Sequence, residues 1–296
     1  MDPFTFVDQN QAMSSGPSLT VTPLTPSIGA RVDGLDSSEP LTSTVFGEIH
    51  AALLDHLVIV LGGQDLTPDQ QIAFTDRFGA VEPHPLNTRP GLDPEARCIV
   101  LENKPDGRGA RNDYWHSDIT CAERPPALSL LHAVTVPDGR GDTSFCNMYR
   151  AWEMLSPGMQ AMVRPLTATH TGEAIRERNR RARTDSSPDI EVPPPVTHPV
   201  LRRHDETGRD ALFTNTHFTT NFTNMTRDES RPLLELFEQV ATRPDNVYRH
   251  RWTSGDLVIW DNRCVMHYAD YDYEPHERRR MHRTTAAGAI PDTAPG

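Results

Sequence analysis

Hydrophobic residues recur every third or fourth position in two parts of the chain. These are Phe46, Ile49, Leu53 and Leu57 in the first part, and Leu233, Leu234, Phe237 and Val240 in the second. Such spacing places apolar side chains on one helical face, so it predicts helices from Val45 to Leu57 and after the Thr226 cap. Capping residues predict two more, after Thr67 and after Ser156, each with proline at the first helical position. Glycine commonly follows the last turn of a helix, so we expect the helix after Thr67 to end near Gly79.

Short apolar runs between turn residues predict strands. The run from Leu57 to Leu61 is typical of a buried strand, and the stretches 98–146 and 247–287 alternate apolar runs with turn residues. Strands at both ends of the chain, with helices between them, favour one closed sheet system over two sequential domains. We therefore expect a single domain over residues 18–296. Residues 1–17 lack periodicity and are predicted to form a mobile tail.

The segment 175–199 contains five arginines, at positions 176, 178, 180, 181 and 183, and three consecutive prolines, 193–195. Two interpretations remain open for this predicted loop. It is either a solvated linker or a lid whose arginines meet an anionic substrate, because long loops in compact domains often cover sites.

The charge balance disfavours several classes of partner. The 296 residues include 29 Lys plus Arg against 41 Asp plus Glu, a formal net charge of −12. Nucleic acids and anionic membranes attract basic proteins, so neither is an expected partner. No apolar run reaches the roughly 20 residues of a membrane-spanning helix, and the start lacks a secretory pattern, which predicts a cytoplasmic protein. The four scattered cysteines fit neither a disulfide framework nor a thiolate zinc site.

Candidate chemistry begins with His116 and Asp118. Side chains two residues apart on a strand point to the same face, so both can reach one metal ion. His267 lies in a distant predicted strand and can supply a third ligand. Two imidazoles and one carboxylate leave coordination positions open, which suits non-haem Fe(II) that must also hold a cosubstrate and O2. Zinc is the competing metal for the same ligands.

Arginines of the segment 278–283 form a second candidate group. The strand period of two places Arg279, Met281 and Arg283 on one side and Arg278, Arg280 and His282 on the other. A guanidinium grips a carboxylate with two parallel hydrogen bonds, which is what a dicarboxylate such as 2-oxoglutarate requires.

These motifs together resemble the taurine dioxygenase (TauD/TfdA-like) family of Fe(II)- and 2-oxoglutarate-dependent oxygenases. The family's pattern is matched in order by Trp115-His116-Ser117-Asp118, by Trp260-Asp261-Asn262-Arg263 with His267-Tyr268-Ala269, and by the arginine-rich strand. The likeness extends from residues 28–30 through 57–61, 70–71 and 77–79 to 286–288. It implies a mainly β fold with flanking α-helices: a double-stranded β-helix, or distorted jelly roll of the cupin kind.

The resemblance also implies roles for individual residues. It makes His116, Asp118 and His267 the iron ligands, and it places Arg279 and Thr143 on 2-oxoglutarate. Arg283 falls near the cosubstrate or a substrate anion. One extra residue after His267, relative to taurine dioxygenase, leaves Arg278 or Arg280 as alternatives to Arg279. For the substrate, it points to His84, Asn112, Ile119, Phe218 and Arg283. Asn87 and His170-Thr171-Gly172 depart from the taurine enzyme's pattern and imply a differently shaped pocket.

The implied reaction is O2-dependent oxidation of a C–H bond, by hydroxylation or oxidative cleavage, in a small anionic organic substrate. Succinate and CO2 are the coproducts. A sulfonate, sulfate ester, phosphonate or amino-acid derivative would fit, and a natural-product tailoring oxygenase of the same family, catalysing hydroxylation or desaturation, is the alternative. A zinc hydrolase and a non-catalytic sensor are more remote. The family also implies a homodimer or homotetramer.

Overall fold

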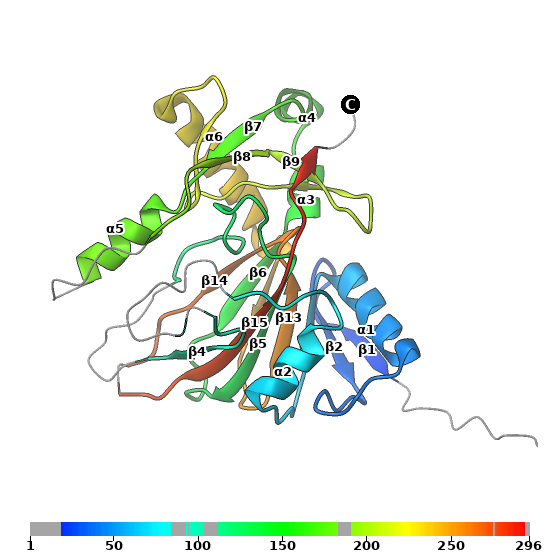
Figure 1. Ribbon diagram of the computed structural model, residues 1–296. Coiled ribbons are helices and arrows are strands. Elements are labelled where there is room, and N and C mark those ends of the chain that lie inside the picture. The colour runs from blue at the N-terminus through cyan, green and yellow to red at the C-terminus, as the bar shows by residue number, and fades with distance from the viewer. Residues whose placement is uncertain are drawn as a thin grey trace, which may run out of the picture.

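The computed structural model describes residues 19–83, 93, 95–103, 112–182, 191–274 and 276–293, and it shows a mainly β protein with helices packed outside it (Figure 1). The helices are α1 Ser43–His56, α2 Pro68–Thr75, α3 Met148–Glu153, α4 Pro157–Val163, α5 Glu173–Ala182, α6 Arg227–Ala241 and the short 3-10 helix Pro244–Asn246. The strands are β1 Thr20–Pro23, β2 Ala30–Asp33, β3 Val58–Leu61, β4 Ile99–Glu102, β5 Leu128–Thr135, β6 Thr143–Asn147, β7 Thr167–His170, β8 Val196–Pro199, β9 Leu201–Arg203, β10 Asp210–Leu212, β11 Thr219–Phe222, β12 Val247–His250, β13 Leu257–Asp261, β14 Val265–Ala269, β15 Arg280–Ala286 and β16 Asp292–Thr293. The tail predicted over 1–17 lies outside the described residues.

Within the described ranges, the largest sheet has seven strands in the order β1-β2-β3-β13-β5-β15-β4. A three-stranded sheet, β12-β6-β14, lies against it, and two further three-stranded sheets, β11-β7-β8 and β10-β9-β16, extend the framework. Strands from both halves of the chain alternate in the large sheet, since β13 pairs with both β3 and β5. This arrangement agrees with the expected jelly roll.

The central strands of the large sheet, β3 and β13, are buried on both faces. One face packs against β6 and β14, where Val58, Val258, Trp260 and Met281 belong to the same apolar cluster as Phe145. The opposite face is covered by α1 and α2, through side chains that include Ile49, Leu53 and Phe74. Burial on both sides explains why β3 reads as the continuous apolar run Val-Ile-Val-Leu rather than as an alternating pattern.

Most predicted helices form at the expected places, with small shifts at their ends. The Thr67 side chain accepts from Gln70 N–H and the Gln70 side chain accepts from Thr67 N–H, a complete capping box. The helix ends at Thr75, before Gly79, because the chain turns at Asp76, whose carboxylate accepts from Val81 N–H at 3.1 Å. Leu57 caps α1 at φ 66°, so the buried strand begins one residue later than predicted.

The predicted loop over 175–199 is partly regular. Helix α5 covers its first residues and β8 its last, while 183–190 lie outside the described residues. Ion pairs at helical spacing explain α5: Arg176 pairs with Glu173, and Arg180 and Arg181 pair with Glu177. In Figure 1, α5 lies apart from the other helices, beside the sheet of β7 and β8.

None of the helices in the described part of the chain is both long and apolar enough to cross a membrane.

Candidate active site

His116 and His267 are held together through their own backbones. His116 N–H donates to the His267 carbonyl at 3.0 Å, and His267 N–H donates to the His116 carbonyl at 2.7 Å. This antiparallel bridge attaches the loop that carries His116 to the edge of β14. The two imidazole rings therefore lie close together, with centroids 4.1 Å apart.

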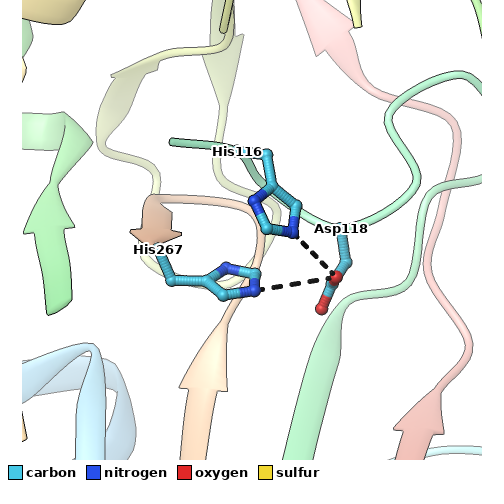
Figure 2. Close-up of side chains that lie close together, drawn as sticks. All are labelled: His116, Asp118 and His267. Atoms are coloured by element: carbon cyan, nitrogen blue, oxygen red, sulfur yellow. Dashed lines mark ion pairs between the residues drawn. The ribbon is translucent and has the colours of Figure 1, made fainter. Parts of the chain in front are cut away.

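Asp118 completes a compact set of three possible metal ligands. Its Oδ1 lies 3.8 Å from Nε2 of His116 and 3.8 Å from Nε2 of His267 (Figure 2). One ligand atom from each residue lies within 4.8 Å of the other two, and all three residues are buried. The side chains predicted from the two-residue spacing and the distant histidine do meet at one point.

The tautomer of His116 follows from its hydrogen bond. Its Nδ1 lies 2.9 Å from the Tyr114 carbonyl, which can only accept, so Nδ1 carries the hydrogen. The lone pair is then on Nε2, the atom that faces Asp118. This is how a metal-binding histidine is usually oriented by a neighbouring carbonyl.

The second oxygen of Asp118 is fixed by a buried network. Its Oδ2 accepts from Ser129 Oγ at 2.6 Å, and Asn262 Nδ2 donates to that Ser129 oxygen at 2.9 Å. Trp260 Nε1 in turn donates to Asn262 Oδ1 at 2.9 Å. Trp260 thus supports the site indirectly, and the Trp-Asp-Asn-Arg motif orients the carboxylate through Asn262.

Charge is balanced inside the site by Arg283. Its Nη2 lies 2.7 Å from Asp118 Oδ2, and neither Nε nor Nη2 has a hydrogen-bond partner of regular geometry among the described residues. Burial opposes ionisation of Asp118, but the Arg283 charge and the hydrogen bond from Ser129 favour it, and the pKa of Asp118 lies well below its ordinary value. Burial lowers the pKa of both His116 and His267.

Two neutral imidazoles and one ionised carboxylate are the protonation states that a divalent metal needs. The three side chains therefore fit such an ion, with the remaining coordination positions open to other ligands.

A second cluster, His204, Asp261 and Cys264, does not fit a metal. His204 Nδ1 accepts from two backbone N–H groups, so its Nε2 carries the hydrogen and donates to Asp261 Oδ2 at 3.0 Å. Arg263 Nη2 also donates to that oxygen, at 2.6 Å. The carboxylate is already occupied, so this cluster is a buried ion-pair network beneath the β13–β14 turn.

The arginine segment divides as the strand period predicts. Arg278 and Arg280 point outward to Glu102, whereas Arg279 and Arg283 are turned inward and Met281 lies in the core. Among the described residues, the Arg279 Nε atom is buried without a hydrogen-bond partner. The side chain passes Gly141, where a Cβ would lie 3.1 Å from Nε.

Thr143, the other predicted 2-oxoglutarate contact, is buried at the start of β6. It lies two positions from Phe145, whose ring centroid is 6.2 Å from that of His267, and so shares its face of the strand. Its Oγ1 accepts from Trp252 Nε1 at 3.0 Å. One lone pair and the hydroxyl hydrogen remain for another contact.

The predicted substrate contacts are only partly described. Ile119 and Phe218 are buried in one apolar cluster, packed against Ile175 of α5. Phe218 faces the candidate metal ligands, with its ring centroid 6.3 Å from that of His116. The Asn112 side-chain oxygen accepts from Tyr114 O–H at 3.2 Å. His84 lies outside the described residues, as does Asn87.

One residue beside the site, His217, was not singled out from the sequence, and Arg178 was named only among the arginines of the predicted loop. The His217 ring stacks on Tyr114 at a centroid distance of 3.5 Å, and the Arg178 guanidinium lies over Tyr114, 4.6 Å from its centroid. Burial, with His116 and Arg178 nearby, lowers the pKa of His217 to about 3. Nothing in the spacing of His217 marks it, but the adjacent Phe218 was a candidate.

Comparisons with known proteins agree with this geometry. A family model described as taurine catabolism dioxygenase TauD, TfdA family, matches residues 20–285. An alpha-ketoglutarate-dependent 2,4-dichlorophenoxyacetate dioxygenase from Cupriavidus pinatubonensis is 36% identical over 283 residues, covering 90% of this chain and 97% of the relative. An alpha-ketoglutarate-dependent sulfate ester dioxygenase from Pseudomonas putida is 32% identical, covering 95% of each chain.

The crystal structure of a taurine dioxygenase from Burkholderia xenovorans superimposes with a TM-score of 0.77 at 32% identity, covering 94% of this chain and 92% of that one. Fold, sequence and the cluster of two imidazoles and a carboxylate thus point the same way. The chain belongs to the TauD/TfdA family, and it is an oxidoreductase that uses Fe(II), 2-oxoglutarate and O2 rather than the zinc hydrolase that the ligand pattern alone left open.

Proposed function

We propose that His116, Asp118 and His267 bind Fe(II), and that the enzyme oxidises a C–H bond of a small anionic organic substrate. The observation that supports this proposal most strongly is that all three residues are buried and that one ligand atom from each lies within 4.8 Å of the other two. When bound, the iron supplies the redox chemistry by which O2 and 2-oxoglutarate oxidise the substrate, with succinate and CO2 as coproducts. The protein's own residues bind and orient the reactants.

Arg279 and Thr143 are the proposed contacts for 2-oxoglutarate. Arg279 is the inward guanidinium whose Nε lacks a hydrogen-bond partner within the described part of the chain. A buried guanidinium of this kind is compensated well by a carboxylate, which accepts two parallel hydrogen bonds. Thr143 has a hydroxyl hydrogen to donate to the same carboxylate. Arg278 and Arg280 are less suitable because Glu102 already pairs with both.

Arg283 is the proposed partner of the substrate's anionic group. It now pairs with Asp118, but a metal cation would compensate that carboxylate and release the arginine for a second anion. Ile119 and Phe218 would enclose the apolar part of the substrate. The relatives named above act on a phenoxyacetate and on sulfate esters, both of which join an anionic group to an apolar body. We propose the same substrate class here.

The test has two stages. Under anaerobic conditions, Fe(II) and 2-oxoglutarate added to the purified protein should produce a visible metal-to-ligand charge-transfer band, and the His116→Ala variant should not. With O2, a panel of sulfonates, sulfate esters, phosphonates, aryloxyalkanoates and amino-acid derivatives is then scored for succinate and oxidised product by mass spectrometry. Absence of the band in folded, iron-loaded protein would reject the ligand assignment. If folded, iron-loaded protein that shows the band oxidises none of these compounds, the anionic substrate class is rejected.

A further inference from the structure

We propose that Arg178 of α5 is a positioning residue that holds Tyr114 and His217 in a fixed arrangement beside His116, and thereby sets the enzyme's affinity for its substrate. This inference rests on the proposed function in that His116 is taken to be a metal ligand. It concerns the part of the site formed by Tyr114 and His217, which is distinct from the proposed metal ligands and from the inward arginines.

Tyr114 lies at the centre of a stack of side chains. Its ring contacts His217 almost in parallel, with an interplanar angle of 19° and centroids 3.5 Å apart. On the metal side it meets the His116 ring at a centroid distance of 4.6 Å. The ring of Phe218 stands edge-on to His217, at 4.8 Å. A molecule bound next to the metal on this side would therefore meet Tyr114, His217 and Phe218.

Arg178 makes two contacts with the segment that carries His116. Its guanidinium lies over the Tyr114 ring, and its Nη2 donates to Asp113 Oδ1 at 2.8 Å. Both charged side chains are about one third exposed, which leaves the ion pair partly shielded from solvent. Stacking and ion pairing together fix the orientation of a planar guanidinium more firmly than either would alone.

The other charged arginines of α5 are placed differently. Arg176 pairs with Glu173, while Arg180 and Arg181 pair with Glu177, so these three stay on the surface of their own helix. Within the described part of α5, Arg178 is thus the arginine that pairs with a residue outside the helix. Arg181 is a natural control, because it has the same chemistry on the same helix and its side chain is 78% exposed.

His217 links this arrangement of side chains to substrate binding. Its Nε2 is buried and lacks a hydrogen-bond partner among the described residues, beside the layer of rings that faces the metal ligands. A neutral imidazole with a free ring nitrogen can hydrogen-bond to a substrate, provided that the ring is held in one orientation. Loss of Arg178 would free Tyr114, and His217 would lose the surface on which it stacks. Arg279, just before β15, and Thr143, on β6, lie in other segments and would be unaffected.

The first experiment needs neither iron nor a known substrate. Hydrogen–deuterium exchange of the metal-free protein is compared for wild type, Arg178→Ala, Arg178→Lys and Arg181→Ala, with peptides covering 112–118 and 173–182. We expect exchange in both peptides to be about 10-fold faster in Arg178→Ala and intermediate in Arg178→Lys, which keeps the charge but not the planar stack. Arg181→Ala should match wild type. Equal exchange in Arg178→Ala and wild type would overturn the proposal.

The second experiment separates positioning from general stability. For the panel compound that the wild type oxidises, Arg178→Ala should raise the substrate KM about 10-fold, while the 2-oxoglutarate KM stays within about 2-fold. Arg178→Lys should restore part of the difference. An unchanged substrate KM, or an equal rise in both KM values, would contradict a positioning role. If exchange rises but no panel compound is oxidised, the proposed substrate class fails while the contacts of Arg178 stand.

Discussion

Asp118 has different neighbours at its two oxygens, and this division explains how one buried carboxylate can serve a metal. Oδ1 faces the two imidazoles, whereas Oδ2 is taken up by Ser129 and Arg283. Because Oδ2 is held, the carboxylate cannot rotate away from the ligand position. The two-residue spacing of His116 and Asp118 could be recognised in the sequence. Ser129 was not, since a serine eleven residues along the chain becomes a neighbour only after β5 has joined the sheet.

Replacing Ser129 by Ala should weaken metal binding without unfolding the protein. The substitution removes a hydrogen bond to Asp118 and leaves Asn262 Nδ2 without its acceptor, so we expect about 10-fold weaker affinity. Calorimetric titration with Mn(II) measures it. Ser144→Ala is the matched control, because Ser144 is buried on β6 but lies on the face opposite Phe145. Equal affinities in the two variants would contradict a role for Ser129.

His170 should make the folded protein sensitive to acid. It is fully buried, and burial lowers its pKa to about 3, so the native ring stays neutral while the unfolded ring takes up a proton near pH 6.5. Stability from this residue is therefore complete above pH 6.5 and is lost as the pH falls toward 3. Between pH 7.5 and 5.5 the loss should reach about 1.4 kcal/mol.

Urea unfolding of the metal-free protein at these two pH values tests that prediction. In His170→Gln, the difference between the free energies of unfolding at pH 7.5 and pH 5.5 should be smaller than in wild type by this amount, whatever the variant's own stability. A His170→Gln variant with the full wild-type pH dependence would show that His170 does not contribute.

At the level of elements, the turn between β5 and β6 helps to place Arg279. Gly139 and Gly141 both adopt positive φ, at 67° and 71°, but their surroundings differ. A Cβ at Gly139 would meet nothing within 4 Å, whereas one at Gly141 would press on Arg279 and Tyr273. Substitution of each glycine in turn therefore separates two effects. Both substitutions strain the backbone and lower the free energy of unfolding, but only the one at Gly141 also displaces Arg279.

Gly139→Ala and Gly141→Ala should each destabilise the protein by about 1 kcal/mol, because alanine is strained at positive φ. Only Gly141→Ala should also weaken 2-oxoglutarate binding, by about 10-fold, since it displaces the guanidinium from its place. Thermal unfolding and an anaerobic 2-oxoglutarate titration measure the two effects. If both variants bind 2-oxoglutarate like wild type, Arg279 is not the contact that we propose.

Elements whose local signals agree with one another were predicted from the sequence, and contacts between distant segments were not. The Thr67 capping box and the apolar face of α6 depend on residues three or four positions apart, and both formed as expected. Helix α5 has a local signal too, Glu173 and Glu177 at helical spacing from arginines, but its polar composition favoured a loop. The stack of Tyr114 on His217 joins segments far apart in the chain, so no local pattern could indicate it.

For the molecule as a whole, metal binding should raise stability, because the proposed ligands come from segments that only the folded state brings together. With free Mn(II) at 100 times its Kd, the gain should be about 2.7 kcal/mol. For a chain of 296 residues, that corresponds to a rise in Tm of about 4 °C. Differential scanning calorimetry with and without EDTA measures it. The Asp118→Ala variant should show no rise, and a rise as large as in wild type would exclude Asp118 as a ligand.

The backbone bridge between His116 and His267 also bears on how the protein is made. Because each residue hydrogen-bonds to the other, the imidazoles come together only when β14 is in place, late in the chain. A polypeptide still being synthesised, or one cut short before β14, has two of the three proposed ligands and no strand to hold them. Incomplete products should therefore not capture iron, and redox-active metal would be confined to chains that have been translated to the end of the fold.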